Sequence, residues 1–156
     1  MVGRADRLAR AVRDHPPVIA ARAGHRCRAG AHSYLADGRV VCWVLPEPES
    51  PHDRPLAHAV DAELALQPVP PGIDARWRLA GIPTRGRFWE LWCATEILAK
   101  LADVPMVLLA RRAPVTCSPV VGPRVEIHHV VTRVGEVVVA HGLAWATTSE
   151  AGPAQA

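Results

Sequence analysis

The chain has 156 residues, 49% of them hydrophobic, and a formal net charge of +3. This length and composition predict a single folded domain with one core and exclude global disorder. The 18 basic residues are dispersed along the chain, so a nucleic-acid partner is not expected.

The N-terminal residues lack the continuous apolar stretch of a secretory signal, and no run approaches the roughly 18 apolar residues of a membrane span. The cysteines are widely spaced and form no CxxC pair, so a structural zinc site is not expected. They are Cys27, Cys42, Cys93 and Cys117. We therefore expect a cytoplasmic protein with reduced thiols, no cofactor, no bound metal and no membrane partner.

The first part of the chain predicts two short helices and a hairpin. Residues 4–14 have an amphipathic helical pattern, which two consecutive prolines end. Within residues 31–45, Asp37-Gly38 separates two β-prone runs, a pattern typical of a β-hairpin. Residues 55–66 predict a second helix.

The middle of the chain predicts a buried helix. Residues 67–86 indicate a proline-interrupted connection with a short strand at 74–79. The stretch "RFWELWCATEILAKLADVP", residues 87–105, has helical length and apolar residues on nearly every side. It ends before Pro105, because a residue that precedes proline is disfavoured in helical geometry. A helix that is hydrophobic nearly all round is buried on most sides.

The last third predicts strands at 106–115, 124–134 and 136–148, the last two forming a hairpin about Gly135. One face of the final strand is bulky and the other is built from small side chains, which lets a helix approach closely. The small face consists of Val138, Ala140, Gly142, Ala144 and Ala146. We therefore predict an α+β fold in which an antiparallel sheet wraps around a buried central helix.

This order of elements, together with "PRVEIHHVVTRVGEVVVAHGLAWATT", resembles the hotdog fold of acyl thioesterases and dehydratases over about residues 73–148. The expected organisation is one domain over residues 1–150. It has an N-terminal helix and hairpin region at 4–72 and a disordered tail at 149–156.

Hotdog enzymes act on acyl thioesters of coenzyme A (CoA) or acyl carrier protein, in a tunnel beside the central helix and usually at a dimer interface. The resemblance therefore implies such a thioester as partner and a homodimer. Dehydratases of this superfamily carry a catalytic histidine before the helix, where this chain has Gly81 in "AGIPTRGRFWELWCATE". That departure favours thioesterase chemistry, which a single helix carboxylate can support.

Glu96 is the candidate catalytic carboxylate, because burial in a central helix would suit it to act as base or nucleophile. The alternative is an exposed Glu96 that pairs with Lys100 one turn later. His129 and His141 are the candidates for polarising the carbonyl or positioning water. His128 is an alternative to His129, because neighbours on a strand point to opposite faces. Two histidines with Glu96 could also hold a metal, an interpretation we do not favour.

Arg85 and Arg87, at the start of the helix, are the candidates for contacting the carrier phosphate; the alternative is a solvated helix start. Trp92 and Cys93 are the candidates for contacting substrate, and the alternative for both is a place in the core. Cys93 followed by a strand histidine also has the order of papain-like and transglutaminase-like enzymes, although it lies too far into the helix for activation by the helix dipole.

The favoured function is an acyl-processing enzyme that hydrolyses an acyl thioester with a carboxylate on the central helix. Two alternatives remain open. One is a non-catalytic small-molecule-binding or partner protein that uses the same cavity. The other is a Cys/His enzyme, or an enzyme similar to chorismate lyase.

Overall fold

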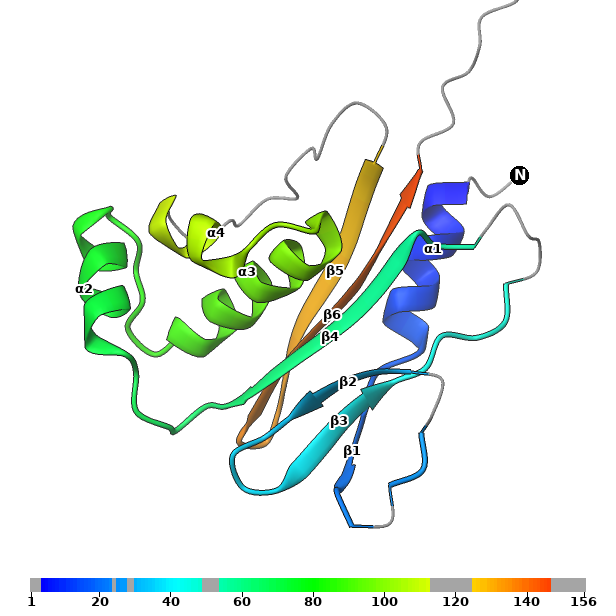
Figure 1. Cartoon of the computed structure of the whole chain (residues 1–156), viewed down its shortest axis with the longest axis horizontal. Helices are drawn as coiled ribbons and strands as arrows, with labels where there is room; N and C mark the ends of the chain where they lie inside the picture. The colour runs from blue at the N-terminus through cyan, green and yellow to red at the C-terminus, as the bar shows by residue number, and fades with distance from the viewer. Residues whose placement is uncertain (1–3, 24, 28–29, 49–53, 113–124, 147–156) are drawn as a thin grey trace, which may run out of the picture.

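The computed structural model describes residues 4–23, 25–27, 30–48, 54–112 and 125–146. In chain order the elements are α1 (Arg4–Asp14), β1 (Val18–Ala21), β2 (Ala31–Tyr34), β3 (Arg39–Trp43), β4 (Ala57–Leu64), α2 (Pro71–Leu79), α3 (Phe88–Ala102), α4 (Met106–Arg112), β5 (Val125–Val134) and β6 (Val137–Ala146). They form two three-stranded antiparallel sheets with helices packed on them (Figure 1), so the α+β class is confirmed. Among the described helices, none is long and apolar enough to cross a membrane.

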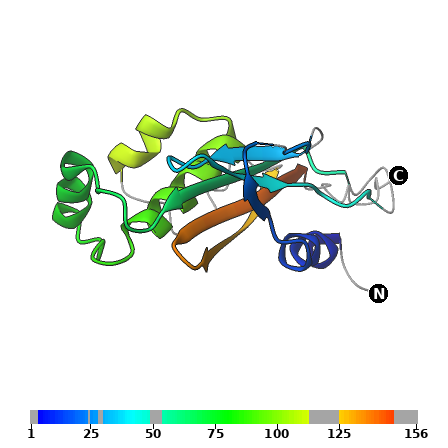
Figure 2. The same ribbon diagram turned by 90° about the horizontal axis from the view of Figure 1, so that it is seen from below.

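Sheet A has the strand order β1-β3-β2, and sheet B has the order β4-β6-β5. The two predicted hairpins are confirmed as β2–β3 and β5–β6. Gly38 and Gly135 lie in their turns with φ angles of 86° and 60°, which favour glycine. The two sheets meet where β2 lies beside β4 (Figures 1 and 2), and Ser33 Oγ there accepts a hydrogen bond from the Ala62 N–H at 3.1 Å.

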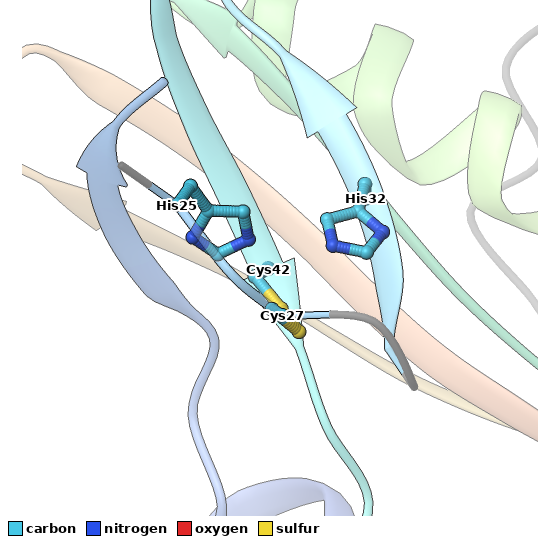
Figure 3. A group of neighbouring side chains, drawn as sticks. All are labelled: His25, Cys27, His32 and Cys42. Atoms are coloured by element: carbon cyan, nitrogen blue, oxygen red, sulfur yellow. A yellow bond between two sulfur atoms is a disulfide. The ribbon is translucent and has the colours of Figure 1, made fainter. Parts of the chain in front are cut away.

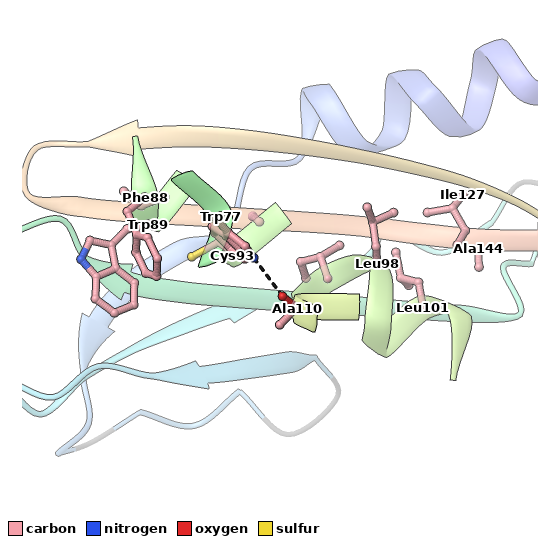
Figure 4. Close-up of a cluster of buried hydrophobic side chains, with 12 residues drawn as sticks. Trp77, Phe88, Trp89, Cys93, Leu98, Leu101, Ala110, Ile127 and Ala144 are labelled. Atoms are coloured by element: carbon pink, nitrogen blue, oxygen red, sulfur yellow. Dashed lines mark hydrogen bonds between the residues drawn. The ribbon is translucent and has the colours of Figure 1, made fainter. Parts of the chain in front are cut away.

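One face of sheet B carries α3 (Figure 1). The small side chains of β6 on this face let the helix approach closely. Ala140 and Ala144 of β6 belong to the same buried cluster as Cys93, Ile97 and Leu98 of the helix (Figure 4). The prediction that a helix packs on the small-residue face of the last strand is therefore confirmed.

The other face of sheet B packs against α1 and sheet A. Val12 of α1, Trp43 of β3 and Leu143 of β6 lie in this second core, and each is at most 1% exposed. Trp43 Nε1 donates a hydrogen bond to the carbonyl of His15 at 2.7 Å, which ties the end of α1 to sheet A. With both faces of sheet B covered, β6 is buried along nearly its whole length.

The surroundings of α3 confirm that it is buried on most sides, since nine of its 15 residues are buried. Away from sheet B, it is covered by α2 and α4. Trp77 of α2 packs against Phe88 at a ring distance of 5.1 Å and donates a hydrogen bond to the Ala110 carbonyl of α4 at 2.9 Å (Figure 4). The enclosure thus comes from one sheet face and two helices, and the hotdog arrangement stays a prediction.

Three predicted elements are wrong. The helix predicted at 55–66 is strand β4, because pairing with β6 along its whole length outweighs the helix propensity of its alanines and leucine. The strand predicted at 74–79 is part of helix α2, whose Pro71 occupies the first turn, where proline is tolerated. The strand predicted at 106–115 begins as helix α4, and its last residues lie outside the described ranges. The predicted tail at 149–156 also lies outside them.

Candidate functional site

A cleft of about 610 Å³ opens at the N-terminal end of α3, bordered by α2, the segment after β4 and the β5–β6 hairpin. Its volume lies within the roughly 300–1,000 Å³ of typical small-molecule sites. The apolar part of the lining consists of Ala65, Val69, Phe88, Trp89 and Val138. The polar part consists of Asp74, Arg78, Thr84, Arg85, Glu90 and Arg133, with Gly86 between the two. Such a lining suits a molecule with one apolar and one charged end.

The chain enters α3 through a tight turn at the cleft. Gly86 has a φ angle of 73°, a conformation that few other residues adopt, and Arg87 follows it as the N-cap residue. No hydrogen bond from the Arg87 side chain caps the helix. Trp89 Nε1 donates a hydrogen bond to the Gln67 carbonyl at 3.1 Å, which fixes the indole against the segment after β4. The cleft therefore lies at the partial positive charge of a helix N-terminus.

The arginines around the cleft differ in how far they are engaged. Arg78 pairs with Asp74 at 2.7 Å, and Arg133 Nε donates to the Gly135 carbonyl at 3.1 Å. Arg85 lines the cleft, is exposed, and has no ion-pair partner within the described ranges. The predicted role of Arg85 in anion binding therefore fits its position, whereas Arg87 does not line the cleft and pairs with Glu90 at 3.1 Å.

A group of charged side chains lies farther along α3, where the helix crosses β4. Lys100 Nζ lies 2.9 Å from Asp61 Oδ1 and 3.0 Å from Glu96 Oε1, and it also donates to the Val60 carbonyl at 3.3 Å. Asp61 is only 4% exposed, and its Oδ2 is buried without a hydrogen-bond partner among the described residues. Asp61 is therefore a buried carboxylate next to the half-exposed ion pair of Lys100 and Glu96.

Burial changes the protonation of this group. Loss of hydration raises the pKa of Asp61 to about 6, and the Glu96 carboxylate adds to the rise, while Lys100 opposes it. Burial alone would lower the pKa of Lys100, but the two carboxylates outweigh it and raise that pKa. A carboxyl group that titrates near neutral pH can exchange protons under physiological conditions, which makes Asp61 a candidate base that the sequence did not indicate.

Glu96, the predicted catalytic carboxylate, occupies the alternative position considered for it. Its side chain is 26% exposed and pairs with Lys100 one turn later, as the spacing predicts. It does not line the cleft at the start of α3.

The histidines of the β5–β6 hairpin are divided between the two faces of sheet B. His129 pairs in register with Gly142, on the face toward α3, and His141 lies on the opposite face. His141 Nε2 lies 2.8 Å from the Val12 carbonyl, and its ring packs edge-on against Trp43 at 4.8 Å. Burial lowers the pKa of both His129 and His141, which favours their neutral forms. The two candidate histidines therefore do not share a site, and His141 has a structural environment.

The remaining predicted residues on α3 belong to its packing. Cys93 is fully buried, and burial raises the pKa of its thiol far above the ordinary value, with the nearby Asp61 adding to the effect. A thiol that stays protonated is a poor nucleophile, so the Cys/His alternative is not supported. Trp92 is half-buried in an aromatic group with Trp77 and Phe88, outside the lining of the cleft.

The described part of the chain also gathers groups that the sequence did not bring together. A second cleft, of about 640 Å³, lies between α1 and the segment after β3, with His58 and Arg54 in its lining. Cys27, in the segment between β1 and β2, and Cys42 of β3 form a disulfide, which corrects the prediction of four reduced thiols. The reason is that the loop after β1 folds back over β3, which no spacing in the sequence shows.

Comparisons with known proteins do not decide between these possibilities. No protein-family model, curated protein or solved structure matches the chain. The function is therefore argued from the geometry of the site alone.

Proposed function

We propose that this protein binds an amphipathic, anionic small molecule in the cleft at the N-terminal end of α3, and that an acyl thioester of CoA or acyl carrier protein is the ligand class. The observation that carries the proposal is the lining of that cleft, where an apolar wall and three arginines border one space of about 610 Å³. A binding protein agrees better with the positions of the side chains than an enzyme does, because Glu96, the predicted catalytic carboxylate, does not line the cleft.

The apolar wall suits an acyl chain. Phe88, Trp89 and Val138 contribute large side chains that are at most 8% exposed, so the wall is continuous with the core beneath α3. The partly exposed apolar residues of the lining are Ala65 and Val69, and covering their apolar surface with a hydrocarbon chain is favourable at about 25 cal/mol per Å². Affinity should therefore increase with the length of the acyl chain until the wall is covered.

The charged rim suits a phosphate or pyrophosphate. Arg85 is exposed at the cleft, and Arg78 and Arg133 lie on the elements that border it. Guanidinium groups bind phosphate through charge-assisted hydrogen bonds, and a helix N-terminus adds a favourable dipole for an anion. Two carboxylates, Asp74 and Glu90, also line the cleft, so the local excess of positive charge is modest.

Calorimetric titration of the full chain with octanoyl-CoA, acetyl-CoA and free CoA tests the proposal. Octanoyl-CoA should bind most tightly, because it alone uses both the apolar wall and the charged rim. Replacing Arg85 by alanine should weaken binding about tenfold, equivalent to about 1.4 kcal/mol. Arg76→Ala is the matched control, because Arg76 is exposed on α2 and does not line the cleft.

Two results would contradict the proposal. One is the absence of heat with all three ligands, and the other is an equal loss of affinity in the Arg85 and Arg76 variants. Changes in Trp89 fluorescence offer an independent signal, because its indole lines the cleft.

Hydrolysis of the bound thioester is the second candidate function, favoured by the raised pKa of Asp61; because Asp61 does not line the cleft, this function also requires the acyl thioester to extend along α3 toward that residue. A carboxyl group with a pKa of about 6 can act as a general base near neutral pH. Release of CoA from octanoyl-CoA should then fall strongly in Asp61→Asn and Glu96→Gln while binding persists. If the wild-type protein releases no CoA above the buffer rate, hydrolysis is rejected and binding alone remains.

A further inference from the structure

Two histidines and two cysteines gather on the side of sheet A that faces away from sheet B (Figure 3). His25 and Cys27 belong to the segment between β1 and β2, His32 lies on β2, and Cys42 lies on β3. His32 and Cys42 are directly opposite each other in the strand register. One donor atom from each of the four side chains lies within 4.8 Å of all the others.

The surroundings of this Cys2His2 cluster are closely packed. Cys42 is 4% exposed, and Nε2 of His25 is shielded from solvent with no hydrogen-bond partner among the residues that the structure describes. A Cβ atom at Gly30 would lie 2.6 Å from the Trp43 carbonyl oxygen and 3.0 Å from Cys27 Sγ, so the segment passes directly over β3. A buried imidazole nitrogen without a partner is unfavourable, and a bound metal ion would supply that partner.

The four donors have the chemistry of a structural zinc site. Two thiolates and two imidazoles surround Zn²⁺ tetrahedrally, with Zn–S distances of about 2.3 Å and Zn–N distances of about 2.0–2.1 Å. That geometry separates the donors from one another by about 3.3–3.8 Å, close to the observed separations of at most 4.8 Å, and reduction frees the two sulfurs to move apart. The disulfide between Cys27 and Cys42 is the oxidised form of the same pair.

We propose that His25, Cys27, His32 and Cys42 bind one Zn²⁺ ion when the Cys27–Cys42 disulfide is reduced. A dithiol reductant transfers two electrons and two protons to the disulfide, becoming a disulfide itself and leaving two thiols. Binding of Zn²⁺ then displaces one proton from each thiol into solvent. The ion fastens the segment between β1 and β2 to sheet A, as the disulfide does in the oxidised protein. The site does not depend on ligand binding near α3, because no residue of sheet A lines that cleft.

Metal titration of the full chain tests the proposal. The protein is reduced with a water-soluble phosphine without oxygen, freed of metal, and titrated with Co²⁺ and then Zn²⁺. One equivalent of Co²⁺ should bind with thiolate-to-cobalt absorption, and Zn²⁺ should displace it. His25→Ala and His32→Ala keep both cysteines, and each should lower the affinity at least about tenfold. His15→Ala is the matched control, because His15 is exposed and its backbone carbonyl, which the substitution keeps, accepts the hydrogen bond from Trp43.

The oxidised protein supplies the second comparison. Without reductant it should show no thiolate-to-cobalt absorption, because the disulfide removes both thiolate donors. Circular dichroism of each histidine variant checks that loss of metal is not loss of fold. The proposal is overturned if the reduced wild-type protein binds no metal, or if His25→Ala and His32→Ala bind it as tightly as wild type. In the first case the cysteine pair serves as a disulfide alone, and in the second case the metal binds without the two histidines.

Discussion

Replacing Asp61 by asparagine should make the protein more stable at neutral pH, although it removes a charge that contacts Lys100. The Asp61 carboxylate is 4% exposed beneath α3, and one of its oxygens has no hydrogen-bond partner among the described residues. Asparagine has nearly the same shape and carries no charge. Lys100 keeps Glu96 as a partner at 3.0 Å.

The size of the effect follows from the pKa of Asp61, which burial raises from an ordinary value of 3.8 to about 6. Between these two values the folded protein binds the proton more tightly than the unfolded chain, so the free energy of unfolding falls as the pH rises. A shift of about two units corresponds to about 3 kcal/mol, most of it between pH 4 and pH 7. At pH 4 the wild-type protein and Asp61→Asn should therefore be similarly stable, and at pH 7 the variant should be more stable by about 2–3 kcal/mol.

Urea unfolding followed by tryptophan fluorescence at several pH values measures the difference. Burial lowers the pKa of His141, and the contribution of such a histidine increases stability as the pH rises, opposite in sign to that of Asp61. The difference between variant and wild type cancels this contribution. Asp103→Asn, at an exposed position, is the control for removing a carboxylate without relieving burial. A difference for Asp61→Asn that does not change with pH would refute the reasoning.

Three further predictions concern the packing around α3. Gly142→Ala should cost about 2–3 kcal/mol of stability, because a Cβ atom there would lie 2.6 Å from a backbone carbonyl of β5. Gly72→Ala is the control and should cost nothing, because a Cβ atom there would have nothing within 4 Å. Thermal unfolding compares the two variants, and equal costs would refute the predicted clash. Trp77→Phe should destabilise the protein by about 2–4 kcal/mol, because it removes the hydrogen bond to the buried carbonyl of Ala110 and part of a buried side chain. Urea unfolding measures the loss of stability, and a loss below about 1 kcal/mol would contradict the prediction. Cys93 should resist alkylation until the protein unfolds, as peptide mapping by mass spectrometry can follow, and rapid labelling of the folded protein contradicts its burial.

The parts of the fold that local signals specify could be predicted from the sequence. The amphipathic pattern of α1, the Asp-Gly turn between β2 and β3, and the two-fold alternation of β5 and β6 all depend on residues close together in the chain. The length and apolar surface of α3 likewise predict its burial, because a helix without a polar face must be covered.

The remainder depends on contacts between distant residues. β4 has a helix-prone composition and becomes a strand because it pairs with β6, so the sequence does not indicate that Asp61 lies beneath α3. The gathering of His25, Cys27, His32 and Cys42 requires the strand register of sheet A and the return of the preceding segment, neither of which the cysteine spacing reveals. The separation of His129 from His141 follows from the register, which pairs His129 with Gly142 and His141 with Val130; a register one residue different would place the two histidines on the same face.

Hydrogen–deuterium exchange with and without octanoyl-CoA tests the proposed ligand site most directly, because it locates binding along the chain. Slower exchange should be confined to peptides that cover residues 65–69, 74–78, 84–90 and 133–138, which border the cleft at the start of α3. Protection instead at residues 7–15 and 45–48 would place the ligand in the cleft beside α1. That result, or no change at a saturating ligand concentration, would contradict the proposal.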